Sequence, residues 1–335
     1  MKNSQIISVI IPVYNGRDHL ACCLTALTQQ SVPLDEIIVV DDGSTDHYDS
    51  IVRGYPVILL RQAHRGPAAA RNLGARSARG DIILFTDVDC EPTPNWVAEM
   101  IQPFSDSLVM GVKGSYKTRQ TESVARLMQI EFEERYDRLE SREQIDFVDT
   151  YSAAFRSGAL HQIGDFDEAL PYANNEDVDL SFRMARAGYK LVFNRHAVVF
   201  HQHINNWTRY IRLKFTRGYW RTIIYRLHPA KAVSDSYTPQ ALKLQIVSLY
   251  LGILFLILAV FLPLQPWIYV LPFLVMLIAA GPFLIRVYKK DRRLILWAVY
   301  AVIVRALAFG AGIIAGLLGG LMFKPNIDRG KAVKI

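Results

Sequence analysis

A short apolar run that ends in two acidic residues constrains this chain most strongly. Residues 81–85 have the composition of a buried parallel strand, and Asp87 and Asp89 follow it one residue apart. Ligands of open α/β sheets bind where strands end, and paired carboxylates there can hold Mg²⁺ or Mn²⁺ against the phosphates of a substrate. An ordinary turn after a strand gives the same pattern, so the remaining motifs decide between the two interpretations.

Other apolar runs extend this strand into a predicted sheet. Strands are predicted at residues 6–11, 36–40 and 57–60, and helices at residues 18–30 and 67–80. Strands that alternate with helices indicate a parallel α/β sheet. A second strand also ends in acidic residues, Asp41 and Asp42. Because successive side chains of a strand point to opposite faces, we expect one of them to face the ligand and the other to support the loop.

A basic segment precedes one of the predicted helices. Arg65 and Gly66 stand just before Pro67, which suits the first turn of a helix, and Arg71 follows within that helix. Glycine and arginine beside a helix N-terminus favour an anion, although a solvated basic loop has the same composition. The segment is therefore a candidate for phosphate binding.

The middle of the chain carries a second acidic motif. Strands are predicted at residues 109–116, 147–155 and 189–200, and helices at residues 122–142 and 157–163. A further helix, ending near Gly188, opens with Glu176 and Asp177, where the helix dipole alone would favour acids. His201 and His203 end the last strand on one face, where they can bind a metal, although such histidines more often pack or face solvent.

Composition divides the chain into a soluble part and a membrane part. The net charge of +7 suits nucleic acid or anionic lipid. Apolar residues are concentrated after about residue 243, which indicates a membrane region, so we expect a lipid surface as partner and no nucleic acid. The three cysteines have neither the number nor the spacing of a disulfide framework or a zinc site, which favours a cytoplasmic domain.

The membrane part begins with a mixed aromatic and basic segment. Residues 207–227 predict a helix in the membrane interface, or one packed on the soluble domain. After a polar hinge at residues 234–243, residues 244–264 and 267–285 are each long enough to span a bilayer. Pro263 stands in the tight loop between them.

The last apolar segment is harder to interpret. The preceding loop, residues 286–293, holds five basic residues and belongs in the cytoplasm by the positive-inside rule. Residues 294–323 contain Arg305, which we expect to face a partner helix or a lipid phosphate, and a glycine stripe that suits close helix packing or a homo-oligomer. Three spans are favoured over a re-entrant or kinked segment, although a full third span would export the basic tail at residues 324–335.

Six segments in consistent order resemble the family-2 inverting glycosyltransferases of the GT-A fold. They read IPVYNG from Ile11, VVDDGSTD from Val39, RGPAAARNLGA from Arg65, FTDVDCEP from Phe85, AAFRSGALHQIGDFDE from Ala153 and NEDVDLSFRMARAGY from Asn175. Such an ordered set is far more specific than any one member. The resemblance implies an α/β, mostly parallel GT-A-type sheet flanked by helices, followed by a helical membrane region.

The domain organisation follows from this resemblance and the membrane pattern together. We expect a catalytic domain over residues 1–205, and an amphipathic interface helix and linker over residues 206–243. Residues 244–323 would form a transmembrane region of two to three helices, ahead of the basic tail.

The resemblance implies roles for residues around the nucleotide base. Pro12, Val13 and Tyr14 would line the base pocket, with Tyr14 in ring contact. Asp42, or else Asp41, would accept a hydrogen bond from the ring N–H of the base.

It also implies roles around the diphosphate. Arg71, or else Arg65, would lie near the pyrophosphate. Asp89 would ligate a divalent cation, Mg²⁺ or Mn²⁺, and Asp87 would contact the ribose, the metal or a metal-bound water. His201 matches a late histidine that some relatives carry near the metal.

Asp177 matches the general base of the family, with Glu176 beside it. The implied activity is transfer from a nucleotide sugar, with a UDP-sugar favoured, to a lipid or lipid-linked glycan in the cell envelope. Processive relatives carry a Gln/Arg-x-x-Arg-Trp motif, which residues 214–220 (KFTRGYW) lack, so one sugar per acceptor is expected.

The expected location is the cytoplasmic membrane, multi-pass, with the catalytic domain facing the cytoplasm. Alternatives are a soluble glycan or protein acceptor, a catalytically silent nucleotide-binding scaffold, and nucleotidyl transfer. The complete acidic set, Asp42, Asp87, Asp89 and Asp177, argues against the silent scaffold.

Overall fold

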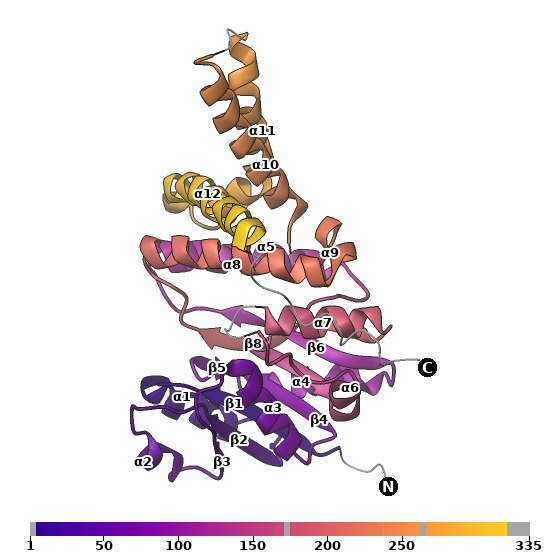
Figure 1. The fold of residues 1–335 in the computed structure, drawn as a ribbon. Coiled ribbons are helices and arrows are strands. Elements are labelled where there is room, and N and C mark those ends of the chain that lie inside the picture. Colours follow the sequence, from indigo (N-terminus) through magenta and orange to yellow (C-terminus); the bar gives the residue numbers. More distant parts are fainter. Residues whose placement is uncertain (1–4, 171–174, 237, 262–264, 320–335) are drawn as a thin grey trace. The chain divides into compact units, whose positions relative to one another are not determined.

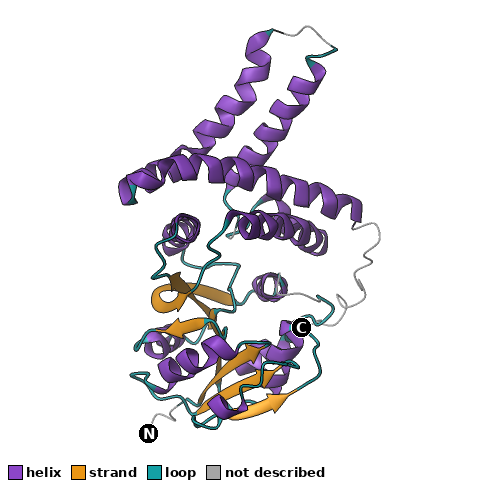
Figure 2. Cartoon of the chain, turned by 90° about the vertical axis from the view of Figure 1, so that its left-hand side faces the viewer, coloured by secondary structure: helices purple, strands orange, loops and turns teal. Residues whose placement is uncertain are grey.

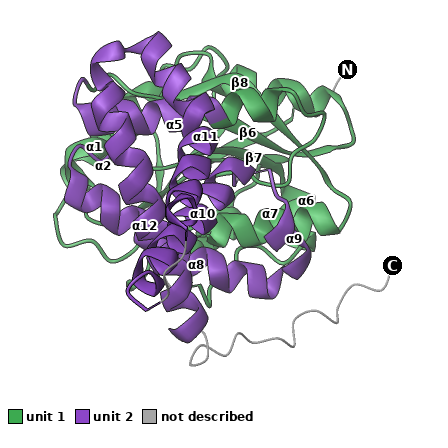
Figure 3. Cartoon of the chain, turned by 90° about the horizontal axis from the view of Figure 1, so that it is seen from above, with its two compact units in different colours: residues 1–120, 135–203 green, residues 121–134, 204–335 purple. Residues whose placement is uncertain are grey.

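The computed structural model describes residues 5–170, 175–236, 238–261 and 265–319. The chain forms two compact units, which Figure 3 colours separately. Unit 1 comprises residues 1–120 and 135–203, and unit 2 comprises residues 121–134 and 204–335. Pro263, the end of the third apolar segment and the predicted basic tail lie outside the described residues.

An eight-stranded sheet organises unit 1 (Figure 1). Its strands are β1 (Ile7–Val13), β2 (Glu36–Asp41), β3 (Ile58–Arg61), β4 (Ile82–Thr86), β5 (Cys90–Pro92), β6 (Val109–Lys117), β7 (Ser152–Arg156) and β8 (Lys190–His201). Their order across the sheet is β3-β2-β1-β4-β7-β6-β8-β5. β1 pairs in parallel with β2 and β4, β2 with β3, and β6 with β8, whereas β7 and β5 run antiparallel to their neighbours. The predicted mostly parallel α/β sheet is confirmed.

Helices flank this sheet (Figure 1). They are α1 (Arg17–Thr28), α2 (Asp49–Val52), α3 (Pro67–Ser77), α4 (Trp96–Ile101), α6 (Ser157–Gln162) and α7 (Glu176–Arg186), with a 3-10 helix at Gln102–Ser105. α5 (Ser123–Glu140) contributes residues to both units. The sequence does not predict α2, α4 or β5, which are elements of 4, 6 and 3 residues.

Two local predictions are wrong. The sequence predicts one strand over residues 147–155, but β7 begins only at Ser152. The backbone N–H of Val148 donates to Ser181 Oγ (3.0 Å) instead of joining the sheet. The first helix, predicted over residues 18–30, runs instead from Arg17 to Thr28 and begins directly after Gly16 without a side-chain cap.

The carboxyl ends of three parallel strands meet at one edge of the sheet. The register pairs Val13 of β1 with Asp41 of β2, and Ile10 of β1 with Phe85 of β4. The strand interiors are buried in a core shared with α3 and α7. α3 packs closely on the sheet because a Cβ on Gly74 would lie only 2.5 Å from Ile10. The acidic strand ends are thereby brought to a common edge.

Unit 2 is helical. Its further helices are α8 (Trp207–Leu227), α9 (Pro229–Val233), α10 (Gln240–Leu258), α11 (Pro266–Lys290) and α12 (Ile295–Gly319), with a 3-10 helix at Arg292–Leu294. α10, α11 and the segment Arg292–Gly319 are long and apolar enough to cross a membrane, which suggests membrane association. α10 and α11 lie side by side in both Figure 1 and Figure 2.

The boundaries of the membrane part differ from the predicted ones. The basic loop predicted at residues 286–293 is largely helical, since α11 continues to Lys290. Basic side chains in a last helical turn are favoured by the helix dipole, so their charge does not end the helix. The polar hinge predicted at residues 234–243 is shortened, because α10 already begins at Gln240.

Arg305 of α12 faces partner helices, as predicted. Its guanidinium donates hydrogen bonds to Glu131 of α5 (2.9 Å) and to Gln245 of α10 (2.9 Å). Glu131 also accepts hydrogen bonds from Lys214 (2.5 Å) and Tyr210 (2.7 Å) of α8. These five residues form what we call the Glu131 cluster, which connects four helices.

The glycines of α12 serve packing within the chain. A Cβ on Gly312 would meet the backbone carbonyl of Phe215 in α8, and a Cβ on Gly316 would lie 2.8 Å from the carbonyl of Tyr219. Small residues allow helix backbones to approach this closely. Because α8 packs directly against these glycines, they do not support the predicted contact between two copies.

Replacing Gly312 with alanine should loosen unit 2. The new Cβ overlaps the backbone of α8, and overpacking of this kind costs about 1–3 kcal/mol. The matched control is Gly281→Ala in α11, where a Cβ meets nothing within 4 Å, so this variant should unfold like the wild type or slightly above it. Thermal unfolding in detergent compares the two, and equal midpoints would contradict the close packing.

Candidate active site

An exposed aromatic ring stands just after β1. Tyr14 is 50% exposed, and its ring stacks on that of His64 with the centroids 4.0 Å apart. Pro12 is partly buried and Val13 is buried. Of the three residues predicted to line the base pocket, Tyr14 therefore offers an accessible ring face. His64 was not predicted, because nothing in its basic loop distinguishes it from its neighbours.

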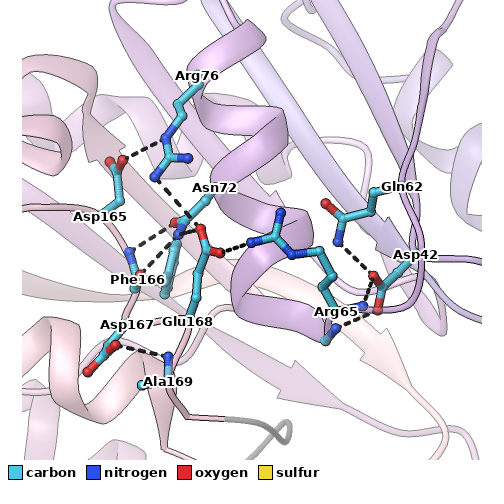
Figure 4. A network of polar contacts seen from close by, with 11 residues as sticks. Asp42, Gln62, Arg65, Asn72, Arg76, Asp165, Phe166, Asp167, Glu168 and Ala169 are labelled. Carbon is cyan, nitrogen blue, oxygen red and sulfur yellow. Dashed lines mark hydrogen bonds and ion pairs between the residues drawn. The ribbon is translucent and has the colours of Figure 1, made fainter. Parts of the chain in front are cut away.

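Asp42 is buried after β2 and holds the loop that precedes α3 (Figure 4). Its Oδ1 accepts hydrogen bonds from Gln62 Nε2 (2.6 Å) and the backbone N–H of Arg65 (2.8 Å), and its Oδ2 accepts one from the N–H of Gly66 (2.9 Å). Asp41 accepts a hydrogen bond within its own turn (2.9 Å). Asp42 thus supports the loop before α3, and the contact of either residue with a base stays a prediction.

The side chain of Arg65 is engaged across the same region (Figure 4). Its Nη2 donates to Glu168 Oε2 (2.7 Å), and Glu168 Oε1 accepts from Asn72 Nδ2 (2.9 Å). Asn72 also exchanges two hydrogen bonds with the backbone of Phe166, both at 3.0 Å. These contacts fix the loop around Phe166 on α3, and they hold Arg65 in an ion pair with a carboxylate.

Arg71 joins three elements at the centre of the site. It is 4% exposed; Nη1 donates to Glu176 Oε1 (2.6 Å) at the start of α7, and Nη2 donates to Asp87 Oδ1 (3.0 Å) after β4. Within the described part of the chain, Arg71 Nε and Glu176 Oε2 are buried without a hydrogen-bond partner. Buried polar atoms are normally satisfied, so a bound polar group is the expected partner here.

Burial sets the charge balance of these acids. It raises the pKa of Glu176 to about 7; the neighbouring Asp177 adds to this rise, and Arg71 opposes it. Burial also raises the pKa of Asp87, against the opposing charge of Arg71. One carboxyl that titrates near neutral pH thus lies beside the predicted base, which is typical of catalytic sites.

Asp89 and His201 come together although they are far apart in the sequence. Asp89 Oδ2 lies 3.3 Å from His201 Nε2. Burial would raise the pKa of Asp89, but the hydrogen bond and charge of His201 hold it below its usual value. Among the residues the structure describes, no group of three or more His, Cys, Asp and Glu side chains forms a complete metal site. One carboxylate and one imidazole fit a cation whose other ligands are phosphates and water.

A buried pair of tyrosine rings packs against His201. The ring centroid of Tyr116 lies 4.5 Å from that of His201, and Tyr116 stacks on Tyr151. Lys113 of β6 is fully buried, donates to Tyr151 Oη (3.2 Å) and forms an ion pair with Asp149. Sequence reasoning missed this support, and its one signal was a lysine in the middle of a predicted strand.

Asp177 lies in the first turn of α7. Asn175 has a positive φ of 84° and turns the chain into this helix. Asp177 Oδ1 accepts a hydrogen bond from the N–H of Val178 (2.8 Å), while Glu176 is held by Arg71. The predicted base thus stands next to a residue that the central arginine fixes.

Comparison with known proteins adds a family and a fold. Residues 8–164 match the family model described as glycosyl transferase family 2. Glycosyltransferase AglE of Haloferax volcanii is 31% identical over 201 residues, which are 56% of this chain and 64% of that protein. Pre-mycofactocin glycosyltransferase of Mycobacterium tuberculosis is 28% identical over 237 residues, which are 67% of this chain and 48% of that protein. The chain therefore spans less than two thirds of both relatives.

Two solved structures share the fold at low sequence identity. Mannosyltransferase PcManGT from Pyrobaculum calidifontis, solved with GDP-Man and Mn²⁺, has a TM-score of 0.59 at 20% identity and covers 97% of this chain and 89% of its own. Glucosyl-3-phosphoglycerate synthase from Mycobacterium tuberculosis, solved with Mn²⁺, UDP and glucosyl-3-phosphoglycerate, has a TM-score of 0.50 at 18% identity and covers 67% and 80%. This likeness confirms the GT-A-type fold.

The raised pKa of Glu176 predicts a pH-dependent stability. Between its ordinary value of 4.5 and about 7, the folded chain keeps a proton on Glu176 that the unfolded chain releases. Stability from this group therefore falls as pH rises through this window. Urea unfolding of Glu176→Gln should lack this loss, so that the variant gains on the wild type from pH 4.5 to 7. The control is Glu143→Gln, whose side chain is 89% exposed; a pH-independent difference for Glu176→Gln would contradict the raised pKa.

Proposed function

We propose that the protein moves one sugar from a nucleoside-diphosphate sugar to a lipid or lipid-linked glycan, because residues 8–164 match the model of glycosyl transferase family 2. The observation that carries the proposal is the contact of Arg71 with both Asp87 and Glu176. This contact links the predicted diphosphate site to the helix that bears the predicted base.

Asp177 is the proposed general base. The hydroxyl of an acceptor has a pKa far above neutral, so its proton must be taken as the oxygen attacks the anomeric carbon. The new C–O bond forms as the bond to the diphosphate oxygen breaks, Asp177 takes the proton, and the nucleoside diphosphate leaves. A single displacement inverts the anomeric carbon, so an α-linked donor gives a β-linked product. Glu176 is held by Arg71, and this contact fixes the first turn of α7, which bears Asp177.

The negative charge on the leaving diphosphate needs compensation. Asp89 and His201 are the proposed protein ligands of a Mn²⁺ or Mg²⁺ ion, with Asp87 nearby. Such a cation supplies charge stabilisation to the leaving diphosphate. Arg71 adds a buried positive charge on the same side, because it already contacts Asp87. Tyr14 offers its exposed ring to the base of the nucleotide.

A lipid or lipid-linked acceptor fits a chain that carries its own membrane helices. α10 and α11 would tether the enzyme to the bilayer where such acceptors reside. The same chemistry on a soluble glycan or protein is the second candidate. A silent nucleotide-binding scaffold is the third, and the ordered acidic residues of the site disfavour it.

The first test is a donor panel on the full chain in detergent. UDP-, GDP- and dTDP-sugars are supplied with Mn²⁺ or Mg²⁺ or with EDTA, in the presence and absence of a lipid extract. We expect turnover that requires both cation and lipid, and that chelation abolishes it. Transfer to a soluble acceptor alone would favour the second candidate, and donor binding without turnover on any acceptor would favour the scaffold.

Asp177→Asn tests the base. The amide keeps the shape of the side chain but takes no proton, so kcat should fall about 10²–10⁴-fold while donor affinity is retained. Glu143→Gln is the matched acid-to-amide control on an exposed side chain and should leave kcat unchanged. Unchanged turnover in Asp177→Asn would remove the base assignment.

A further inference from the structure

α8 and α12 run side by side in the same direction. At one end, the ring of Trp207 lies 5.7 Å from that of Trp297 and 4.7 Å from that of Tyr300. At the other end, Arg226 Nη2 donates a hydrogen bond to the carbonyl of Leu317 (2.8 Å). The two helices therefore stay in contact over most of the length of α12.

Glycines bring the two backbones together between these ends. A Cβ on Gly218 of α8 would meet the backbone of Phe309, and a Cβ on Gly316 of α12 would lie 2.8 Å from the carbonyl of Tyr219 and 3.0 Å from Thr222. Contact this close leaves no room for lipid between the helices. Wherever α12 lies in a membrane, α8 lies directly beside it.

α8 is unsuited to the interior of a bilayer. Its basic residues run from its first turn to its last: Arg209, Arg212, Lys214, Arg217, Arg221 and Arg226. Three of them are exposed: Arg209, Arg212 and Arg226. The described helices apolar enough to cross a membrane are α10, α11 and α12, and charged side chains are unfavourable in hydrocarbon. If α12 crossed the bilayer, its contacts would force α8 into the hydrocarbon as well.

α12 exposes one apolar face and buries the other. Its exposed apolar residues recur at helical spacing: Leu296, Tyr300, Ile303, Leu307, Ile314 and Leu318. The opposite face, which includes Ala301, Arg305 and Gly312, is buried within unit 2. An apolar face with basic residues alongside is typical of a helix that lies in the membrane surface.

Residues typical of the headgroup region gather where α11 ends and α12 begins. Lys289 and Lys290 close α11, Arg292 and Arg293 follow, and all four are exposed. Trp297, 46% exposed, stands in the first turn of α12. Basic and Trp side chains favour the level of the headgroups, so α12 starts at a membrane surface.

We propose that α10 and α11 alone cross the bilayer, and that α8 and α12 lie together along its surface. Figure 1 shows α12 at the foot of the α10–α11 pair, next to α8. The exposed face of α12 enters the boundary between headgroups and acyl chains, and the exposed arginines of α8, Arg209, Arg212 and Arg226, meet headgroup phosphates. This inference rests on the membrane attachment proposed above and replaces the three spans that the sequence favours.

Depth measurements on the full chain test this arrangement. Single cysteines are placed along the exposed face of α12 (Leu296→Cys, Leu307→Cys, Leu318→Cys) and on the crossing helices (Leu254→Cys, Leu274→Cys). Cys22→Ser serves as background, because Cys22 is exposed while Cys23 and Cys90 are buried. A fluorophore on each cysteine is quenched, in phosphatidylcholine–phosphatidylglycerol vesicles, by lipids spin-labelled near the headgroup or near the chain end.

We expect the three α12 positions to be quenched alike, and more strongly by the shallow label. Leu254→Cys and Leu274→Cys should be quenched more strongly by the deep label. Deep quenching at Leu307→Cys with shallow quenching at its two flanking positions would show a third span and overturn this inference alone. Absence of quenching at the α10 and α11 positions would overturn the membrane attachment itself, and this inference with it.

A labelling experiment provides a second measurement that needs no substitution in a helix. A cysteine added after Ile335 and the native Cys22 are exposed to a membrane-impermeant maleimide in sealed vesicles. Two crossing helices put both thiols on one side, so they should react together. Reaction from opposite sides would overturn the proposal.

Discussion

The arrangement of the candidate active site depends on one buried arginine side chain. Arg71 of α3 contacts Asp87, which follows β4, and Glu176, which begins α7. Removing one partner from a buried ion pair typically costs about 3–5 kcal/mol, because the remaining charge is left without compensation. Arg71 thereby holds together the end of β4, helix α3 and the start of α7. The geometry of the candidate site therefore depends on this bridge.

In unit 2, packing rather than composition decides how the apolar helices are used. Length and hydropathy alone admit three spans. The contact of α12 with α8 removes one of them, because each arginine at the centre of a membrane helix costs about 2.5–3.5 kcal/mol even on the most permissive scale, and α8 carries several. Glycines on α12 would by themselves suit a contact between two copies, but here they pack against α8.

The sequence predicted those elements that depend on local residue patterns. β1, β2 and β4 followed from β-branched runs, and α3 from Pro67 at its first turn. β5 was missed because its three residues are too few to show a pattern, and the strand forms by pairing with β8. The partners of the site acids could not be predicted, since Arg71 and Glu176 are 105 positions apart and meet only through the fold. The resemblance supplied residue roles, but not the fact that Arg65 is already paired with Glu168.

Each unit contains a buried cluster of three charged side chains. The central charge is the carboxylate of Glu131 in unit 2 and the guanidinium of Arg71 in unit 1. In unit 2, burial would raise the pKa of Glu131, but Lys214 and Arg305 outweigh it and lower the pKa to about 2. That carboxylate stays ionised at any physiological pH, so the Glu131 cluster acts as a permanent cross-link between helices. In unit 1, the central charge is Arg71, which contacts both Asp87 and Glu176. At Glu176, burial and the neighbouring Asp177 outweigh Arg71 and raise the pKa to about 7. A carboxyl that titrates near neutral pH is typical of catalytic sites, whereas a structural cross-link needs a carboxylate that stays ionised.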